Sequence, residues 1–462
     1  MTTIIRRLSI AAILILSTNS IVAQESLIDV YQLALINDPL IREAEANYLA
    51  TAEVKPQARS NLLPGLNLTS GKSHQFSESQ SGAVVGGSGE QIGTATEFES
   101  DRENWAISLT QTVFDWGQYK TLRQAEKQVT QAETIYQAAM QDLLIRVAEA
   151  YFNVLAAEDT LTSEIAAREA IGRQLEQAQR RFEVGLIAIT DVQESQAFYD
   201  QAIATEINAQ RNVATRQEFL REIIAVLIPD LAGPRDDMPL QTPDPANAEQ
   251  WVRNALGQNL NLLASRIAVD VAQVGIQIQR SARLPTLSFS AGYNESTTEQ
   301  LVTVFSPLFP GGNPRPSVSA PEGYNWSFDL RVPLFTGGFN SSRIQQSVYQ
   351  HRAAQESLER VARQTERETR DAYLGVISEI SRVRALRQAV QSSSTALRAA
   401  EAGFEVGTRT TVDVLVSQQN LRLAETNYAR SRYDYILNVL RLRQAAGGLS
   451  VEDFEQIDGW LQ

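Results

Sequence analysis

Two stretches of the chain carry a helical pattern that runs far beyond the length of an ordinary helix. Residues 117–185 and 338–407 contain no proline and are rich in Ala, Gln, Glu, Leu and Arg. In the first stretch Leu144, Ala148 and Tyr151 follow one another at steps of four and three residues, the spacing of a packing stripe. About 68 helical residues extend ~100 Å, whereas globular helices average roughly 11–12 residues. The pattern therefore predicts long helices at 117–184 and 338–406, which would build a rod or tube.

A stretch of alternating apolar and polar residues precedes each long helix. Around 105–114 and 325–335 the alternation has period two over about ten residues, which is typical of a tilted membrane-spanning strand. The predicted partner strands, 66–76 and 286–294, alternate less cleanly. A soluble antiparallel sheet with one wet face would show the same alternation, so the strands alone leave both readings open.

The segments between the partner strands are polar. Residues 77–104 are rich in Gly, Ser and acidic residues, and residues 295–325 contain several prolines. Long polar loops at one end of the strands suit the outer face of an outer-membrane barrel. We therefore expect loops over these two segments.

Shorter helical segments match the long ones in length. In the first half, residues 39–60 and 186–228 give helices of ~33 and ~65 Å, which together equal the long helix. In the second half, residues 259–282 and 408–446 give helices of ~36 and ~58 Å, which together nearly equal the second long helix. We expect each long helix to run away from the sheet, the medium helix to return from the tip, and the short helix to complete the distance.

The second half of the chain repeats the first at a shift of about 222 residues. The Phe-Glu-Val-Gly sequence at 182–185 recurs at 404–407. A proline-rich stretch separates the halves, and it should gather with the first helix and the tail as a collar around the rod. In chain order we expect a signal peptide at 1–23, a first repeat at 24–228, a linker at 229–248, a second repeat at 249–446 and a tail at 447–462.

The N-terminus carries the pattern of a secretory signal. Arg6 and Arg7 precede an apolar run at 8–16, and Ala23 offers a cleavage site. This run is too short to cross a membrane, and no other run approaches the ~20 residues needed. An exported chain of this kind either stays free or crosses a membrane as a closed β-barrel, because only a barrel pairs every backbone group in lipid. Since even eight strands leave no water channel, several chains would share such a barrel.

Composition and motifs argue against nucleic-acid binding and catalysis. The net charge is −13, and no basic stripe is present. The chain has no cysteine and two histidines, His74 and His351, so no thiolate site, metal cluster or His-based triad can be argued. Phosphate-binding glycine loops and nucleophile motifs are missing from the sequence. We expect no enzyme, no cofactor and no metal, and the missing cysteine excludes an acylated N-terminus.

Four motifs point to a known family. They are Asn-Asp-Pro at 37–39, Ala-Tyr-Phe-Asn-Val-Leu at 150–155, Arg-Phe-Glu-Val-Gly-Leu-Ile-Ala-Ile-Thr-Asp-Val-Gln at 181–193, and Val-Gly-Thr-Arg-Thr-Thr-Val-Asp-Val-Leu at 406–415. Through them the chain resembles the TolC family of outer-membrane efflux proteins over essentially its whole mature length. The resemblance implies a mixed fold: a homotrimer, with four strands per chain, that shares one twelve-stranded membrane β-barrel. The barrel continues as a periplasmic coiled-coil tunnel, an α-helical barrel with an equatorial collar.

The resemblance also implies a function and partners. The trimer would be a passive exit channel of a tripartite efflux or type I secretion system in the outer membrane. Its partners would be a periplasmic adaptor (membrane fusion) protein and an inner-membrane pump or ABC exporter. The alternative is an exported soluble or surface coiled-coil scaffold without channel activity.

Candidate gate residues lie at the two helix tips. In similar proteins an Arg and an aromatic hydroxyl on the second hairpin hold a Thr-Asp pair on the first. Here Arg409 matches the Arg, and Thr190 with Asp191 matches the pair. The aromatic position is Phe404, which lacks a hydroxyl, so closure should lose a hydrogen bond of ~0.5–1.5 kcal/mol and depend more on Arg409.

The resemblance places a constriction just after these links. Asp413 matches an acidic ring, in which three carboxylates would raise one another's pKa and attract cations. Val416 occupies the position of a second acidic ring, so we expect a weaker cation block. Either aspartate, Asp191 or Asp413, could instead serve as a helix N-terminal cap.

The exposed Val-Gly steps at the tips are the candidate adaptor-docking sites. Gly185 and Gly407 should end their helices in the left-handed conformation. The nominated docking residues are Val184, Gly185, Leu186, Val406, Gly407 and Thr408.

Overall fold

The computed structural model describes residues 25–84, 91–235, 238–306 and 309–461. The predicted signal peptide lies outside these residues. The chain divides into two compact units, which are described one at a time. The sheet unit comprises Glu43–Ala138 and Leu260–Thr365, and the helical unit comprises Met1–Arg42, Ala139–Asn259 and Glu366–Gln462.

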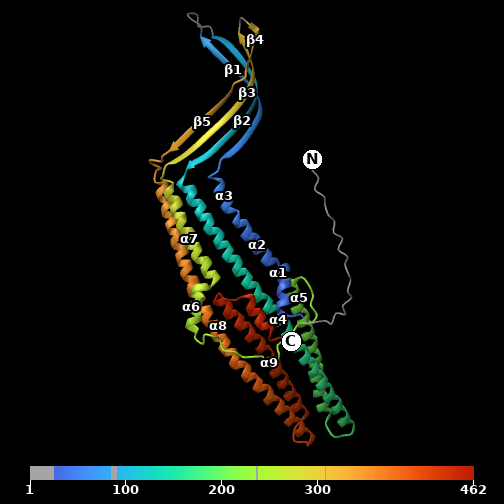
Figure 1. Cartoon of the computed structure of the whole chain (residues 1–462). Coiled ribbons are helices and arrows are strands. Elements are labelled where there is room, and N and C mark those ends of the chain that lie inside the picture. Colours follow the sequence, from blue (N-terminus) through green and yellow to red (C-terminus); the bar gives the residue numbers. More distant parts are fainter. Residues whose placement is uncertain (1–24, 85–90, 236–237, 307–308, 462) are drawn as a thin grey trace, which may run out of the picture. The chain divides into compact units, whose positions relative to one another are not determined.

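Two of the helices are far longer than the rest (Figure 1). α4 has 68 residues and α8 has 67, each ending within one residue of the predicted bounds. The predicted short helix at 39–60 is divided in two, and the tail contains a helix of its own. Within the described parts, no helix is both long and apolar enough to cross a membrane. The helices are α1 (Leu27–Asn37), α2 (Pro39–Ala52), α3 (Val54–Ser60), α4 (Trp116–Glu183), α5 (Ile189–Ile224), α6 (Ala248–Gln258), α7 (Leu260–Ser281), α8 (Phe339–Glu405), α9 (Thr411–Ala445) and α10 (Val451–Asp458).

The sheet unit holds one antiparallel sheet. Its strands are β1 (Gly65–Val84), β2 (Gln91–Phe114), β3 (Thr286–Ser306), β4 (Phe309–Ser319) and β5 (Glu322–Arg331). β1 pairs with β2, and β2 pairs with β3. β5 pairs with residues 286–295 of β3, and β4 pairs with residues 298–306 of β3. The two short strands therefore follow one another along the same edge of β3. The sheet therefore has the four predicted strand positions, with the fourth interrupted.

The strands are longer than predicted, and the expectation of polar loops over 77–104 and 295–325 is wrong. β1 stays paired with β2 as far as Val84 opposite Gln91, and β4 occupies much of the second segment. Backbone pairing does not require apolar side chains, so a Ser- and Gly-rich sequence can still form a strand. A search for apolar alternation misses such strands.

Cross-strand charge pairs support this polar part of the sheet. Lys72 Nζ lies 2.7 Å from Glu103 Oε1, and these residues stand directly opposite each other in the β1–β2 register. His74 and Asp101, which also stand directly opposite each other, form a hydrogen bond with 3.0 Å between Nδ1 and Oδ1. Opposite charges in register favour strand pairing.

Most of the largest fully buried side chains among the described residues lie in the helical unit. Tyr151 and Phe152 on α4 pack edge to face at 5.3 Å, and Phe152 stacks on Tyr433 of α9 at 5.8 Å. The hydroxyl of Tyr151 donates to the carbonyl oxygen of Ala232 at 2.7 Å, which ties the linker to α4. Burial raises the pKa of this tyrosine. The hydroxyl therefore remains a hydrogen-bond donor.

The chain ends and the linker gather on this core. Residue Glu25 forms a parallel bridge with Leu231 of the linker, and Pro234 bridges to Leu461 near the C-terminus. The backbone N–H of Leu27 on α1 donates to Asp458 on α10 at 2.9 Å. This assembly corresponds to the predicted collar.

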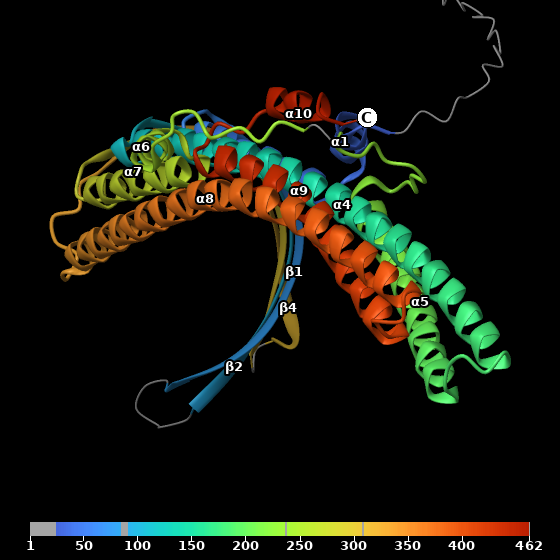
Figure 2. The ribbon, with the colours of Figure 1, turned by 90° about the horizontal axis from the view of Figure 1, so that it is seen from below.

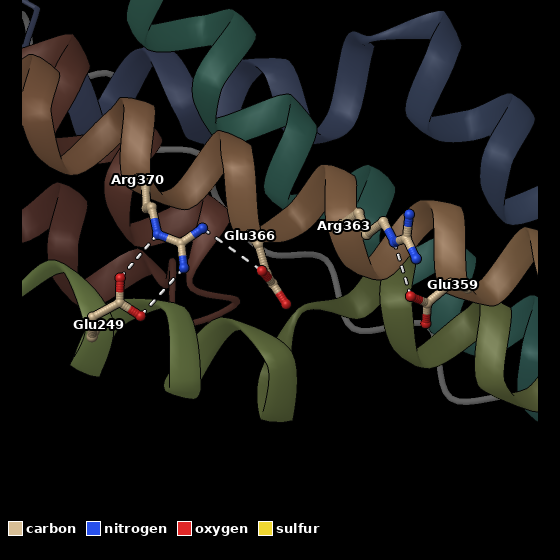
Figure 3. A network of polar contacts seen from close by, with 5 residues as sticks. All are labelled: Glu249, Glu359, Arg363, Glu366 and Arg370. Atoms are coloured by element: carbon tan, nitrogen blue, oxygen red, sulfur yellow. Dashed lines mark hydrogen bonds and ion pairs between the residues drawn. The ribbon is translucent and has the colours of Figure 1, made fainter.

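A charged network attaches α6 to α8 (Figure 3). The Arg370 guanidinium donates through Nε and Nη2 to the two Glu249 carboxylate oxygens, at 3.0 and 3.3 Å, and also lies near Glu366 on its own helix. The hydrogen bonds from Arg370 hold the pKa of Glu249 below its usual value. A bidentate pair of this kind fixes direction as well as distance.

The far ends of the long helices form two hairpins within the helical unit. α4 turns back into α5, and α8 turns back into α9, as Figure 2 shows. We call α4 with α5 the first hairpin and α8 with α9 the second hairpin. All of the predicted tip residues lie in or beside these two turns.

Candidate functional site

The turn of the first hairpin is closed by a glycine cap. Gly185 has a φ of 77°, in the left-handed region that favours glycine. The N–H of Leu186 donates to the carbonyl of Arg181 and that of Gly185 to the carbonyl of Phe182, both at 2.8 Å. These two bonds define a Schellman motif, which ends a helix sharply.

The second hairpin uses the same device. Gly407 has a φ of 75°. The N–H of Thr408 donates to the carbonyl of Gly403 at 2.8 Å, and that of Gly407 to the carbonyl of Phe404 at 3.2 Å. The two turns therefore share one backbone design.

Both turns present apolar side chains to solvent. Val184 and Leu186 in the first turn are 69% and 73% exposed, and Val406 in the second is 74% exposed. Exposed aliphatic side chains at the end of a long helix are a surface that a partner protein can cover. All six predicted docking residues lie in these two turns.

The start of α9 is capped by side chains. The backbone N–H and the hydroxyl of Thr410 both donate to Asp413 Oδ2 at 2.9 Å, and the Asp413 N–H donates back to Thr410 Oγ1 at 3.2 Å. This reciprocal arrangement is a capping box. The hydrogen bonds from Thr410, followed by the charge of Arg409, lower the pKa of Asp413. Within one chain this opposes the increase that neighbouring Asp413 carboxylates would cause.

The start of α5 lacks such a cap. Its N-cap residue is Ala188, which makes no side-chain hydrogen bond. Asp191 is the third residue of the helix, and its carboxylate forms no hydrogen bond or ion pair with any residue that the structure describes. The predicted capping role therefore applies to Asp413 and not to Asp191.

Arg409 does not reach the Thr190–Asp191 pair within the chain. Its Nη1 lies instead 3.7 Å from Asp413 Oδ1, on its own hairpin. Val416, one helical turn after Asp413, is exposed. The structure therefore pairs Arg409 with Asp413 and leaves the Asp191 carboxylate without a partner among the described residues.

Phe404 has a different neighbour from the predicted one. Its side chain is 9% exposed and packs on Ala400 and Val414. The guanidinium of Arg181, on the first hairpin, lies 4.4 Å from the centre of its ring. The sequence reasoning missed Arg181, although a ring without a hydroxyl was a reason to look for a nearby cation.

Comparisons with known proteins assign the chain. A family model described as outer membrane efflux protein matches residues 30–226 and 251–448. The chain is 36% identical to outer membrane protein TolC of Vibrio cholerae over 447 residues, covering 96% of this chain and 95% of that protein. The chain belongs to the outer membrane efflux protein family.

Other relatives of this family agree. The alkaline protease secretion protein AprF of Pseudomonas aeruginosa is 29% identical over 93% of this chain and 86% of that protein. The solved structure of the Campylobacter jejuni CmeC outer membrane channel covers 95% of this chain and 90% of its own with a TM-score of 0.70, at 16% identity. Membership of the outer membrane efflux protein family places the chain in the outer membrane, and it confirms the predicted fold class of a membrane sheet combined with a long helical tunnel.

Proposed function

We propose that three copies of this chain form one outer-membrane exit channel for efflux or type I secretion. Family membership carries the proposal, because relatives with matching length are named for outer-membrane efflux and for protease secretion. Members of this family are channel proteins, which supports a channel and not an enzyme.

The open edges of the sheet support sharing between copies. Among the described strands, β1 pairs with β2 alone, and β4 and β5 pair with β3 alone, so both edges carry unpaired backbone groups. Unpaired backbone groups are costly in lipid, and joining edge to edge around a ring removes them. Three copies would contribute twelve strand positions.

The sheet also has an apolar exposed face. On β5 the side chains of Trp326, Phe328 and Leu330 occur at every second position, and all are exposed. Side chains two apart in a strand point to the same face. A face of this composition suits contact with lipid hydrocarbon.

The two hairpins would supply the periplasmic tunnel and its gate. We propose that Arg409 holds Thr190 and Asp191 in the closed assembled channel, because the Asp191 carboxylate has no hydrogen-bond or ion-pair partner among the described residues of the chain. Phe404 belongs to the same hairpin as Arg409, and Asp413 and Val416 would form the constriction next to them. The exposed residues of the two turns, 184–186 and 406–408, would dock a periplasmic adaptor that links the channel to an inner-membrane pump or ABC exporter.

Membrane fractionation and electrophoresis test the assembly. The channel should remain in the outer-membrane fraction and migrate, unheated, as an oligomer of three 51.1 kDa chains less the signal peptide. A soluble monomer would favour the coiled-coil scaffold instead.

Planar-bilayer recording tests the gate. Replacing Arg409 with Gln and Asp191 with Asn together should raise single-channel conductance, because both sides of the closing contact lose their charge. Unchanged conductance in this double variant would remove the proposed gate while leaving the channel assignment intact.

A further inference from the structure

Near its turn, each hairpin has an apolar cluster of its own. In the first hairpin, Leu175 and Ala178 of α4 pack with Val192 of α5. In the second, Ala400 and Phe404 of α8 pack with Val414 of α9. Because neither cluster includes a residue of the other hairpin, each tip can hold together by itself.

One contact joins the two tips beside their turns. The guanidinium of Arg181 covers the ring of Phe404 at 4.4 Å from its centre. Phe404 is nearly buried and Arg181 is half-buried, so the contact is partly removed from water. Such removal strengthens a cation–π interaction. By contrast, the pair formed by Lys120 and Trp116 lies along a single helix.

Both partners also belong to the glycine caps. The carbonyl of Arg181 accepts the N–H of Leu186, and the carbonyl of Phe404 accepts the N–H of Gly407. A contact between these two side chains therefore fixes one turn against the other. It acts on the backbone at the place where each helix ends.

Farther from the turns, an apolar cluster also joins the two hairpins: Ile171 of α4 and Ala202 of α5 pack with the fully buried Leu415 of α9. A cleft of about 210 Å³ lies between α4, α5 and α9, lined by residues that include Ile171, Ala202 and Leu415. At its edge Arg422 of α9 forms an ion pair with Glu164 of α4, whose side chains are 17% and 7% exposed. Glu164 lies ~25 Å along α4 from Arg181. The apolar cluster and the buried ion pair can thus act as a fixed region between the hairpins, while the contact of Arg181 with Phe404 lies beside the turns themselves.

We propose that Arg181 is a positioning residue of the closed channel, which holds the second hairpin against the first by covering the ring of Phe404. The inference rests on the proposed channel function. A phenyl ring cannot donate a hydrogen bond, so the negative face of the ring is the polar feature that Phe404 offers to a partner. When the hairpins separate, this ring and the guanidinium must both be exposed to water.

Single-channel recording on the purified full chain tests the contact. Arg181→Gln and Phe404→Leu should each raise the open fraction roughly threefold or more, and the double variant should rise no further than the larger single effect. Arg180→Gln is the matched control, because it removes the same charge one residue earlier, where the side chain is exposed and pairs with Glu176 on its own helix. An equal rise in the control would show that net charge at the tip, and not the ring contact, sets the open fraction.

Fluorinated phenylalanines at position 404 separate the cation–π contact from simple packing. Each added fluorine weakens the negative face of the ring while changing its size little, so the open fraction should increase step by step. An open fraction that ignores fluorination, although Phe404→Leu raises it, would overturn the proposal in favour of packing alone. Arg181→Lys, which keeps the charge but loses the planar group, should give an intermediate value.

The outcomes for the contact and for the channel are distinguishable. A wild-type protein that conducts, together with Arg181 and Phe404 variants that conduct identically to it, would overturn the contact but leave the channel in place. A wild-type protein that never conducts would overturn both. Unheated electrophoresis of each variant verifies that the oligomer has assembled before its recording is used.

Discussion

The two hairpin turns have the same backbone and different side-chain chemistry. Gly185 and Gly407, which lie 222 positions apart, close the turns with the same Schellman motif. The helix that follows begins with Ala188 in the first hairpin and with Thr410 in the second. The hydroxyl of Thr410, which Ala188 lacks, therefore decides whether the aspartate three residues later is held by hydrogen bonds in a capping box.

This difference gives the two equivalent aspartates different surroundings. Asp413 is held by Thr410 at the start of its own helix. Asp191 has no such partner among the described residues, so its charge is available to a cation from another element. The two turns therefore share their backbone fold and differ in whether the carboxylate is held at the start of its own helix.

The largest effect is expected when the N-cap residue of the second hairpin is introduced into the first. Ala188→Thr would place a hydroxyl where Thr410 stands, so that Asp191 should close a capping box and become less available to Arg409. Losing a charge-assisted contact of about 1.5 kcal/mol would shift the closed-to-open ratio roughly tenfold. Single-channel open probability measures this shift.

Ala188→Val is the control for this substitution, since it adds a branched side chain without a hydroxyl. A rise in open probability should appear in the Thr variant alone. If the Thr variant protects the α5 amides from hydrogen exchange but leaves the open probability unchanged, Asp191 takes no part in closure.

Both glycine caps should be equally sensitive to a side chain. Gly185→Ala and Gly407→Ala should each destabilise their turn by about 1–2 kcal/mol, because an L-residue is strained at these φ values. A Cβ at either position would contact nothing within 4 Å, so the cost lies in the backbone alone. Hydrogen–deuterium exchange of the turn amides measures it.

Gly257→Ala, in α6, serves as the control for the cap variants. This glycine has no positive φ and no atom close to its added Cβ, so the substitution should stabilise the helix. Unequal losses at Gly185 and Gly407 would contradict the shared backbone design.

Removing the cap of α9 should have a smaller effect and act on one hairpin only. Thr410→Ala should destabilise the start of α9 by about 1 kcal/mol, because two cap hydrogen bonds are lost. Faster amide exchange is expected over 410–416, with none over the equivalent 188–194. A matching loss in the first hairpin would show that the caps are coupled through the tips.

The pH dependence should be the smallest effect. The pKa of Asp413 is lowered from 3.8 in the folded chain, so its cap contributes in full above pH 3.8 and is lost as the pH falls through the lower folded value. Amide protection at the start of α9 should therefore persist from pH 6 down to about pH 4. Loss of protection already near pH 5 would mean that repulsion between Asp413 side chains of neighbouring copies outweighs the hydrogen bonds from Thr410.

The regular parts of the fold could be predicted because their patterns are local. The absence of proline and the terminal glycines defined α4 and α8 to within one residue. The outer halves of the strands could not be predicted in this way, because pairs such as Lys72 with Glu103 are favourable only after the strands have met.

The positions of the candidate site residues could be predicted from the sequence, but their side-chain contacts could not. Spacing placed all predicted tip residues in or beside the two turns. It did not reveal that Thr410 donates a hydrogen bond to Asp413. Nor did it reveal that Arg181 covers the ring of Phe404, because this contact joins residues more than two hundred positions apart. Tertiary packing decides such pairs.

The conductance of the purified wild-type protein in planar lipid bilayers tests the central claim most directly. If three copies pool their sheets around one pore, insertion should produce discrete current steps of uniform size from an oligomer that unheated electrophoresis resolves. A preparation that stays monomeric without detergent and leaves the bilayer without current steps would contradict the account.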